Sequence, residues 1–269
     1  MNDDSSLALF CDFENIALGV RDSRHARFDI RPVLERLLVK GSIVAKKAYC
    51  DWDRYKEFKP AMHEAAFELI EIPHVRMSGK NSADIRMVVD ALDLCYTKDH
   101  IDTFVIISGD SDFSPLVSKL RENAKTVIGV GVKNSTSDLL ISNCDEFIFY
   151  DELVSDGRAR AEDGKGRGRK KSRTKKSKTS KPKEEDPAGE AIDLVLETVE
   201  ALYAERGDST KIWGSMVKQA LKRRRPGFNE SSWGFRSFSE LLEEAQDRNL
   251  LQLELDEKSG GYVIRKVTA

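Results

Sequence analysis

The stretch FVIISGDSDFSPLV (residues 104–117) places two aspartates, Asp110 and Asp112, directly after an apolar strand. Two like charges enclosed in one place repel each other and lose solvation, so the fold must compensate for them. A bound cation is the simplest compensation. The stretch therefore predicts a buried strand that delivers both carboxylates to a cation-binding site.

Strand and helix patterns alternate on both sides of this stretch. Apolar runs predict strands at residues 6–11, 43–50, 67–75, 103–108, 126–132 and 146–150. Helical patterns lie between them at residues 30–39, 54–67, 83–97, 115–123 and 137–144, and Ser114 is the expected N-cap of the helix that carries Pro115 in its first turn. This alternation predicts an α/β fold, a doubly wound and mostly parallel sheet with helices on both faces.

Several acidic residues fall where ligands bind in such folds, beyond the carboxyl ends of the strands. Asp12 follows the first strand, as Asp110 and Asp112 follow the fourth. Asp84 begins a helix, and Asp90 lies about 240° further around that helix, so one helix face cannot present both equally. We therefore expect Asp84 to join the site and Asp90 to serve in a cap, an ion pair or an outer contact.

A site built from carboxylates alone favours Mg²⁺ or Mn²⁺, which prefer oxygen ligands. The chain has only 4 histidines, which disfavours zinc. Carboxylates around a divalent metal are suited to phosphodiester hydrolysis, and they require no serine, cysteine or histidine nucleophile. The alternative for each aspartate taken singly is a helix cap or a turn.

Three segments, LFCDFENIALGV, KNSADIRMVVDALD and FVIISGDSDFSPLVSKLRENAKTVIGVGV, together resemble successive blocks of a NYN domain, a branch of the PIN-like metal-dependent ribonucleases. The resemblance covers about residues 5–153. It implies an acidic metal site at Asp12, Asp84, Asp110 and Asp112, with Asn15 as a polar neighbour and with RNA as the substrate. Asp90 also matches a family position.

Other phosphate chemistries fit the residues less well. A haloacid-dehalogenase phosphatase needs a second aspartate where CDFENI has Glu14, and a topoisomerase-primase fold needs a glutamate where this chain has Asp12. The GVGV run lacks the third glycine of a dinucleotide-binding fingerprint. Ser135, Thr136 and Ser137 are expected to cap the next helix, and the alternative for them is contact with an RNA phosphate.

The charge is distributed unevenly along the chain. Residues 1–153 carry 19 Lys+Arg against 26 Asp+Glu, residues 154–189 carry 13 against 6, and residues 190–269 carry 12 against 14. The middle block has no aromatic residue and cannot bury a core, so it is expected to be a disordered basic linker. It is either a solvated spacer or an arm that binds polyanions.

The last block predicts a second, small domain. Helical patterns at 189–206, 210–224 and 237–249 precede two strands around the turn KSGG, which is a winged-helix layout. The stretch VKQALKRRRPGFNESSWGFRSFSELLEEA resembles the LOTUS, or OST-HTH, domain, and this implies RNA and protein partners. Trp233, Phe235 and Phe238 are expected mainly in the core. The cations expected to contact RNA are Lys218, Lys222, Arg223, Arg224, Arg225 and Arg236.

These expectations combine into one function. Residues 1–153 would be the nuclease domain, residues 154–189 the linker and residues 190–269 the winged-helix domain that delivers RNA. The competing function is a non-catalytic RNA-binding adaptor that keeps the metal pocket. No apolar run is long enough to span a bilayer, and the acidic start MNDDSSLALF is unlike a signal peptide, so a cytoplasmic protein is expected. The sequence does not fix the oligomeric state.

Overall fold

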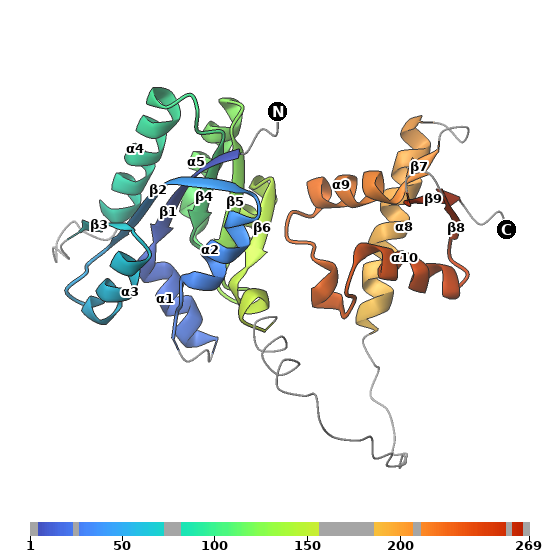
Figure 1. The fold of residues 1–269 in the computed structure, drawn as a ribbon, viewed down its shortest axis with the longest axis horizontal. Helices are drawn as coiled ribbons and strands as arrows, with labels where there is room; N and C mark the ends of the chain where they lie inside the picture. The colour runs from blue at the N-terminus through green and yellow to red at the C-terminus, as the bar shows by residue number, and fades with distance from the viewer. Residues whose placement is uncertain are drawn as a thin grey trace, which may run out of the picture. The chain divides into compact units, whose positions relative to one another are not determined.

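A computed structural model describes residues 5–23, 27–72, 82–155, 186–206, 211–256 and 260–265. The chain divides into two compact units, one on either side of residue 165 (Figure 1). The expected linker lies almost wholly outside the described residues.

The first unit contains a sheet of six parallel strands in the order β3-β2-β1-β4-β5-β6. Figure 1 shows β1 and β4 side by side in its middle. The strands are β1 (Ser5–Asp12), β2 (Gly41–Cys50), β3 (Glu68–Glu71), β4 (Thr103–Ile107), β5 (Thr126–Gly131) and β6 (Glu146–Phe149). The order confirms a doubly wound α/β sheet, because the chain winds outward from β1 in one direction and from β4 in the other.

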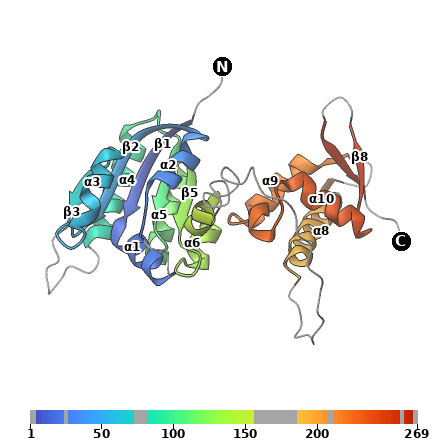
Figure 2. The same cartoon turned by 60° about the horizontal axis from the view of Figure 1, so that its bottom comes forward.

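Helices cover both faces of this sheet (Figure 2). One face packs on α1 (Phe13–Asp22), α2 (Arg31–Leu38) and α3 (Lys59–Glu64), and the other on α4 (Ser82–Thr97), α5 (Ser114–Glu122) and α6 (Asp138–Asn143). Alternate residues of β1 supply the two cores: Leu7 and Leu9 point to the first face, and Ala8 and Phe10 to the second. This is the alternation that a buried strand requires.

Several local predictions were wrong. The helix expected over residues 54–67 is a short η1 (Lys56–Phe58) followed by α3, and the sequence did not predict α1 at all. Ser114 does not cap its helix: Phe113 occupies the N-cap, and the buried Ser114 hydroxyl has no hydrogen-bond partner within the described residues. The cause is η2 (Ser111–Phe113), a turn of 3₁₀ helix that runs directly into α5.

The second unit consists of helices and one small sheet. Its elements are α8 (Pro187–Arg206), β7 (Ile212–Trp213), α9 (Gly214–Arg224), η3 (Glu230–Trp233), α10 (Phe238–Asp247), β8 (Gln252–Leu255) and β9 (Tyr262–Arg265). The strands pair antiparallel in the order β7-β9-β8. Phe235 and Phe238 are buried in its core and Trp233 packs against it, as predicted. In the part of the chain that the structure describes, no helix is both long and apolar enough to cross a membrane.

Candidate active site at the centre of the parallel sheet

The carboxyl ends of β1 and β4 lie next to each other, with Cys11 opposite Ile107. The strand order reverses between these two strands, so the connections that follow them diverge and leave a crevice, which is where open α/β sheets bind ligands. Asp12 ends β1, and Asp110 and Asp112 lie just beyond β4. The sequence prediction that strand ends bring these aspartates to one edge of the sheet is therefore confirmed.

Asp12 is almost fully enclosed, with 8% of its surface exposed. It caps α1, because its Oδ1 accepts a hydrogen bond from the Asn15 backbone nitrogen at 3.3 Å, and its Oδ2 accepts one from the Ser108 hydroxyl at 3.0 Å. Burial, and then the charge of Asp84, raise the pKa of Asp12 to about 7, although both hydrogen bonds lower it. The carboxyl group thus changes charge near neutral pH.

Ser108 joins Asp12 to the acidic turn after β4. Its hydroxyl oxygen accepts a hydrogen bond from the Asp110 backbone nitrogen at 3.2 Å while it donates to Asp12. Asp110 in turn caps η2 by accepting from the Asp112 nitrogen at 3.0 Å. The sequence prediction did not include Ser108, although its place immediately before GDSD was a signal.

Asn15 ties the first turn of α1 to the same loop. Its side-chain oxygen accepts a hydrogen bond from the Gly109 backbone nitrogen at 2.8 Å. The side chain expected to be a polar neighbour of the site therefore holds the backbone between β4 and the acidic turn. This contact leaves the amide nitrogen of Asn15 for other partners.

Asp84 brings a third element to the crevice, because it lies in the first turn of α4. Burial, and then the charges of Asp110, Asp112 and Glu14, raise its pKa to about 6. Asp84 and Asp112 also line one groove of about 720 Å³, between α4 and α5, whose other walls are largely apolar. The four aspartates therefore act on one another electrostatically, and Glu14 adds a fifth charge that the predicted site did not include.

The spacing of these carboxylates is wider than that of a formed metal site. Among the residues that the structure describes, no three His, Cys, Asp or Glu side chains lie close enough together to hold a metal ion. The donor set still fits Mg²⁺ or Mn²⁺, because it consists of carboxylate oxygens. Burial is the main cause of the raised pKa of Asp12 and of Asp84, and the charges of neighbouring aspartates add to both shifts.

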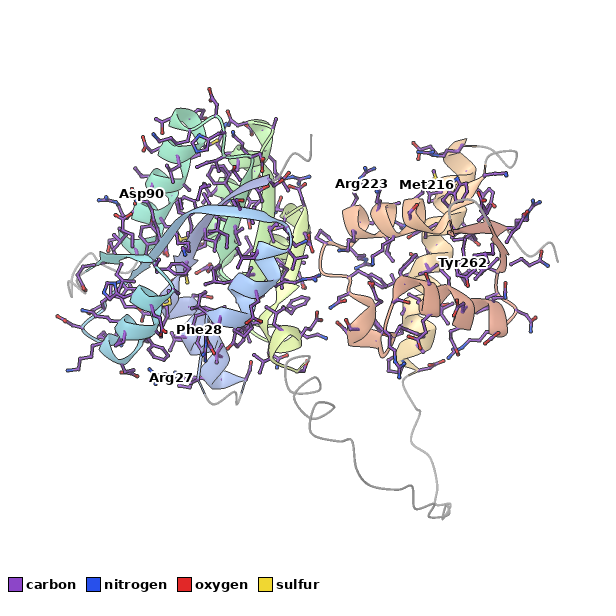
Figure 3. All side chains as sticks on the ribbon, viewed as in Figure 1. Arg27, Phe28, Asp90, Met216, Arg223 and Tyr262 are labelled. Atoms are coloured by element: carbon purple, nitrogen blue, oxygen red, sulfur yellow. The ribbon has the colours of Figure 1, made fainter. Side chains whose placement is uncertain are left out.

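Asp90 has a different environment. Its carboxylate accepts a hydrogen bond from the Tyr49 hydroxyl at 2.9 Å and forms an ion pair with Arg86 at 3.0 Å. The Lys47 ammonium lies 3.9 Å away. Figure 3 shows Asp90 on α4, well along the helix from its start. Of the three roles expected for Asp90, a cap, an ion pair or an outer contact, the structure shows the ion pair.

The loop after β5 packs against the acidic site. The Ser137 nitrogen donates a hydrogen bond to the Gly109 oxygen at 2.9 Å, and the Ser137 hydroxyl caps α6. The hydroxyls of Ser135 and Thr136 donate to the Val132 oxygen at 3.5 and 2.8 Å. Capping is confirmed for Ser137 alone, and the other two hydroxyls hold the loop in place beside the crevice.

The cations predicted to contact RNA in the second unit differ in their ion pairs and in their exposure to solvent. Lys218 forms an ion pair with Glu230 at 2.6 Å, and Arg224 lies 3.7 Å from Glu197. Those with exposed side chains are Arg223, Arg224, Arg225 and Arg236, while Lys218 and Lys222 are half-buried. Figure 3 shows Arg223 at the surface of α9. The run from Lys222 to Arg225 thus offers several exposed charges at one helix end.

Comparison with known proteins gives relatives for the first unit. The "Meiosis regulator and mRNA stability factor 1" of Xenopus tropicalis is 29% identical over 150 residues, which is 56% of this chain and 9% of that protein. An uncharacterized protein of Methanocaldococcus jannaschii is 28% identical over 134 residues, half of this chain and 52% of its own. The chain therefore spans only a small part of the first relative.

A solved structure has the same fold. A protein of unknown function from Vibrio parahaemolyticus superposes with a TM-score of 0.51 at 25% identity, covering 57% of this chain and 97% of that one. The family model described as the NYN domain matches residues 6–151, which contain β1 to β6 and all four aspartates. NYN domains are generally nucleases, and typically ribonucleases. The chain belongs to the NYN domain family.

Proposed function

We propose that this protein is a divalent-metal-dependent ribonuclease that hydrolyses RNA phosphodiesters at the crevice between β1 and β4. The observation that carries the proposal is the position of Asp12, Asp110 and Asp112 at the adjacent carboxyl ends of β1 and β4, with Asp84 lining a groove together with Asp112. A cation is one way to compensate for carboxylates gathered where a doubly wound sheet binds its ligands. The family supplies independent support, because NYN domains are typically ribonucleases.

The roles of the side chains follow from their positions. The four aspartates would hold the metal, Mg²⁺ or Mn²⁺, and Ser108 and Asn15 would orient them through the contacts described above. When bound, the metal would activate water and neutralise charge on the leaving oxygen. Because Asp12 and Asp84 are partly protonated near neutral pH, metal binding must displace protons, so its affinity should increase as the pH rises towards 8.

A cleavage assay tests this proposal. Labelled single-stranded RNA is incubated with the full chain in Mg²⁺, in Mn²⁺ and in EDTA. We expect cleavage only with metal, and we expect Asp110→Asn to lower the rate by about 100-fold or more. Asp99→Asn is the matched control, because Asp99 is an exposed aspartate outside the crevice.

The metal itself is tested by melting curves. Millimolar Mg²⁺ or Mn²⁺ should raise the melting temperature of the full chain, because it binds the folded state preferentially. Asp12→Asn and Asp112→Asn should reduce that rise, whereas Asp99→Asn should not. The same rise in all of these variants would show that the metal binds elsewhere.

One observation favours a competing function, a non-catalytic RNA-binding adaptor. Within the described ranges, no three carboxylates already share one coordination sphere. An adaptor would bind RNA, and it would show no metal-dependent cleavage at any concentration of wild-type protein. The assay above therefore separates the two functions directly.

We also propose how the chain is divided. Residues 1–153 form the nuclease domain, residues 154–189 a basic linker that attracts RNA, and residues 190–269 a winged-helix domain of the LOTUS type. The order helix, strand, helix, helix and two-stranded hairpin in the second unit supports a winged helix. RNA and a protein partner are the proposed ligands of this domain, and the cytoplasm is the proposed location.

A further inference from the structure

A second pocket opens beside α1, on the sheet face opposite α4 and α5. Its volume is about 680 Å³, which is within the usual range for ligand clefts. Figure 3 shows Arg27 and Phe28, two of its residues, together beside α1. Its charged and aromatic lining, called here the arginine pocket, consists of Arg21, Arg27, Arg54, Phe28, Tyr55 and Phe58, with Glu57 as a single carboxylate.

Arginines are concentrated in this pocket although its domain is acidic. Residues 1–153 carry more acidic than basic side chains, yet three arginines gather here from three separate segments. Arg21 lies 3.4 Å from Asp22 and Arg54 lies 3.5 Å from Glu14, and both pairs are largely exposed to solvent. Arg27 forms no ion pair within the described residues; its Nη2 donates to the Glu57 backbone oxygen at 2.6 Å. A guanidinium held by a neutral carbonyl keeps its full charge for a ligand. The ligand that fits such a site is an anion.

The aromatic residues add a flat apolar surface. The Arg27 guanidinium carbon lies 4.4 Å above the centre of the Phe58 ring, and Tyr55 packs beside Phe58 with ring centres 6.5 Å apart. Phe13, in the core beneath, contacts both rings and fixes their positions. Arginine planes and tyrosine rings are the surfaces on which unpaired bases stack. A nucleotide of single-stranded RNA offers both an anionic phosphate and a flat base to such a surface.

The arginine pocket is connected to the acidic crevice through Glu14. The Arg54 guanidinium lies 3.5 Å from the carboxylate of Glu14. Glu14 is in the first turn of α1, the helix that Asp12 caps. Glu14 therefore contacts an arginine of the pocket and lies two residues from Asp12 of the crevice. From Glu14 to Arg21 the helix rises about 10 Å, a distance that a few nucleotides can span.

We propose that the arginine pocket is a second RNA subsite, which binds an unpaired nucleotide a few positions away from the phosphate that is cut. Arg21, Arg27 and Arg54 contact the phosphates, and the base stacks on Tyr55 and on the Arg27 plane. The inference rests on the proposed ribonuclease function and narrows its substrate to single-stranded RNA. A duplex cannot place a base in this pocket without unpairing it.

Binding is measured in EDTA, so that cleavage does not interfere. A fluorescent single-stranded RNA of about 12 nucleotides is titrated into the full chain at several salt concentrations. We expect Arg27→Ala and Arg54→Ala each to raise Kd by about 3- to 10-fold and to lower the salt slope by about 0.7. Arg36→Ala is the matched control, because Arg36 is an exposed arginine on α2 that does not line the pocket. Equal effects of Arg27→Ala and Arg36→Ala would overturn the proposal.

Stacking is tested separately from charge. Tyr55→Leu should raise Kd by about 10-fold, whereas Tyr55→Phe should change it less than 2-fold, because only the first removes the ring. Arg27→Lys should bind more weakly than wild type, since lysine keeps the charge but lacks the plane. Melting curves of each variant establish that it is folded. Photo-crosslinking of 4-thiouridine RNA to the wild-type chain should label the peptide that contains Tyr55, and crosslinks confined to other peptides would contradict the subsite.

These measurements distinguish the proposal of an RNA subsite from the proposal of ribonuclease activity. If wild type cleaves RNA and Arg27→Ala binds and cleaves as well as wild type does, the subsite is wrong and the ribonuclease stands. If no variant cleaves but Arg27→Ala loses affinity in EDTA, the subsite stands without catalysis. Competition by an acidic peptide, lost in Arg27→Ala while RNA affinity is kept, would assign the pocket to a protein partner instead.

Discussion

Asp12 shows how strongly the fold alters the chemistry of one side chain. The unfolded chain ionises this carboxyl group near its ordinary pKa of 3.8, but the folded chain does so only near pH 7. The folded state therefore holds a proton over the intervening range that the unfolded state has lost. The stability that Asp12 contributes is complete below about pH 4 and is lost as the pH rises through about 7.

Asp12→Asn should remove this dependence. Without metal, we expect the melting temperature of the variant to exceed that of wild type by about 5 °C at pH 7.5, and the difference to shrink as the pH falls to 4. Calorimetry in EDTA at several pH values measures it. Asp99→Asn, at an exposed position, should follow wild type throughout. If the melting temperatures of wild type and Asp12→Asn changed with pH in the same way, the pH dependence could not be assigned to the buried carboxyl group of Asp12.

Asp90 should behave as a structural residue. Its carboxylate holds Tyr49 and Arg86, and only 14% of its side chain is exposed. We expect Asp90→Asn to lower the free energy of unfolding by about 1 to 3 kcal/mol, because charged hydrogen bonds are lost. Urea denaturation measures this cost. The cleavage rate per folded molecule should stay near that of wild type, unlike that of Asp84→Asn, and an equal loss of rate in both would place Asp90 in the active site.

Residues next to strand ends were predictable, and residues that meet through tertiary packing were not. The position of Asp12 and Asp110 follows from the rule that parallel strands present their carboxyl ends at one edge. By contrast, the contacts of Arg54 with Glu14 and of Arg27 with Phe58 join segments whose spacing carries no periodic signal. The arginine pocket could therefore not be predicted from the sequence.

The loop after β5 is fitted closely against the strand that precedes it. A Cβ atom on Gly131 would lie 2.4 Å from the Thr136 hydroxyl oxygen and 3.0 Å from the Phe147 ring. Gly131→Ala should therefore destabilise the protein by about 1 to 3 kcal/mol in urea denaturation. Adding Thr136→Ala removes the nearest atom and should restore part of the loss. If the double variant were no more stable than Gly131→Ala, the steric conflict would lie elsewhere.

Whole elements were predicted where their periodicity was long. All six strands of the large sheet were expected, whereas α1 was missed because its residues FENIALGVRD begin inside the candidate metal motif. The strand β7 has two residues, Ile212 and Trp213, and pairs with β9 at the far end of the second unit. A pattern of that length cannot be distinguished from a helix start, so only the tertiary pairing identifies it.

The uneven charge of the chain leads to a prediction for the full-length protein. Residues 154–189 carry 13 Lys+Arg against 6 Asp+Glu, while residues 1–153 are acidic. Deleting residues 157–183 should lower the affinity for RNA and flatten its salt dependence, yet leave cleavage of a saturating short RNA largely intact. Changing Arg223, Arg224 and Arg225 to alanine should instead reduce selectivity among RNAs. RNA binding of wild type, the deletion and the triple variant is measured across a series of salt concentrations. If the deletion left the salt dependence of Kd unchanged, the basic tract would be only a spacer.

The position of β1 also determines when the acidic crevice can form during synthesis. This strand comes first in the chain, but one of its two neighbours is β4, and the hydrogen bond from Ser108 to Asp12 joins residues 96 positions apart. Such long-range pairing is slow, because the intervening chain must first be ordered. Until β4 leaves the ribosome, one side of β1 remains an open apolar edge that is prone to aggregation. Pairing of β4 with β1 also brings Ser108 and the acidic turn to Asp12, so the acidic crevice cannot form before β4 has been synthesised.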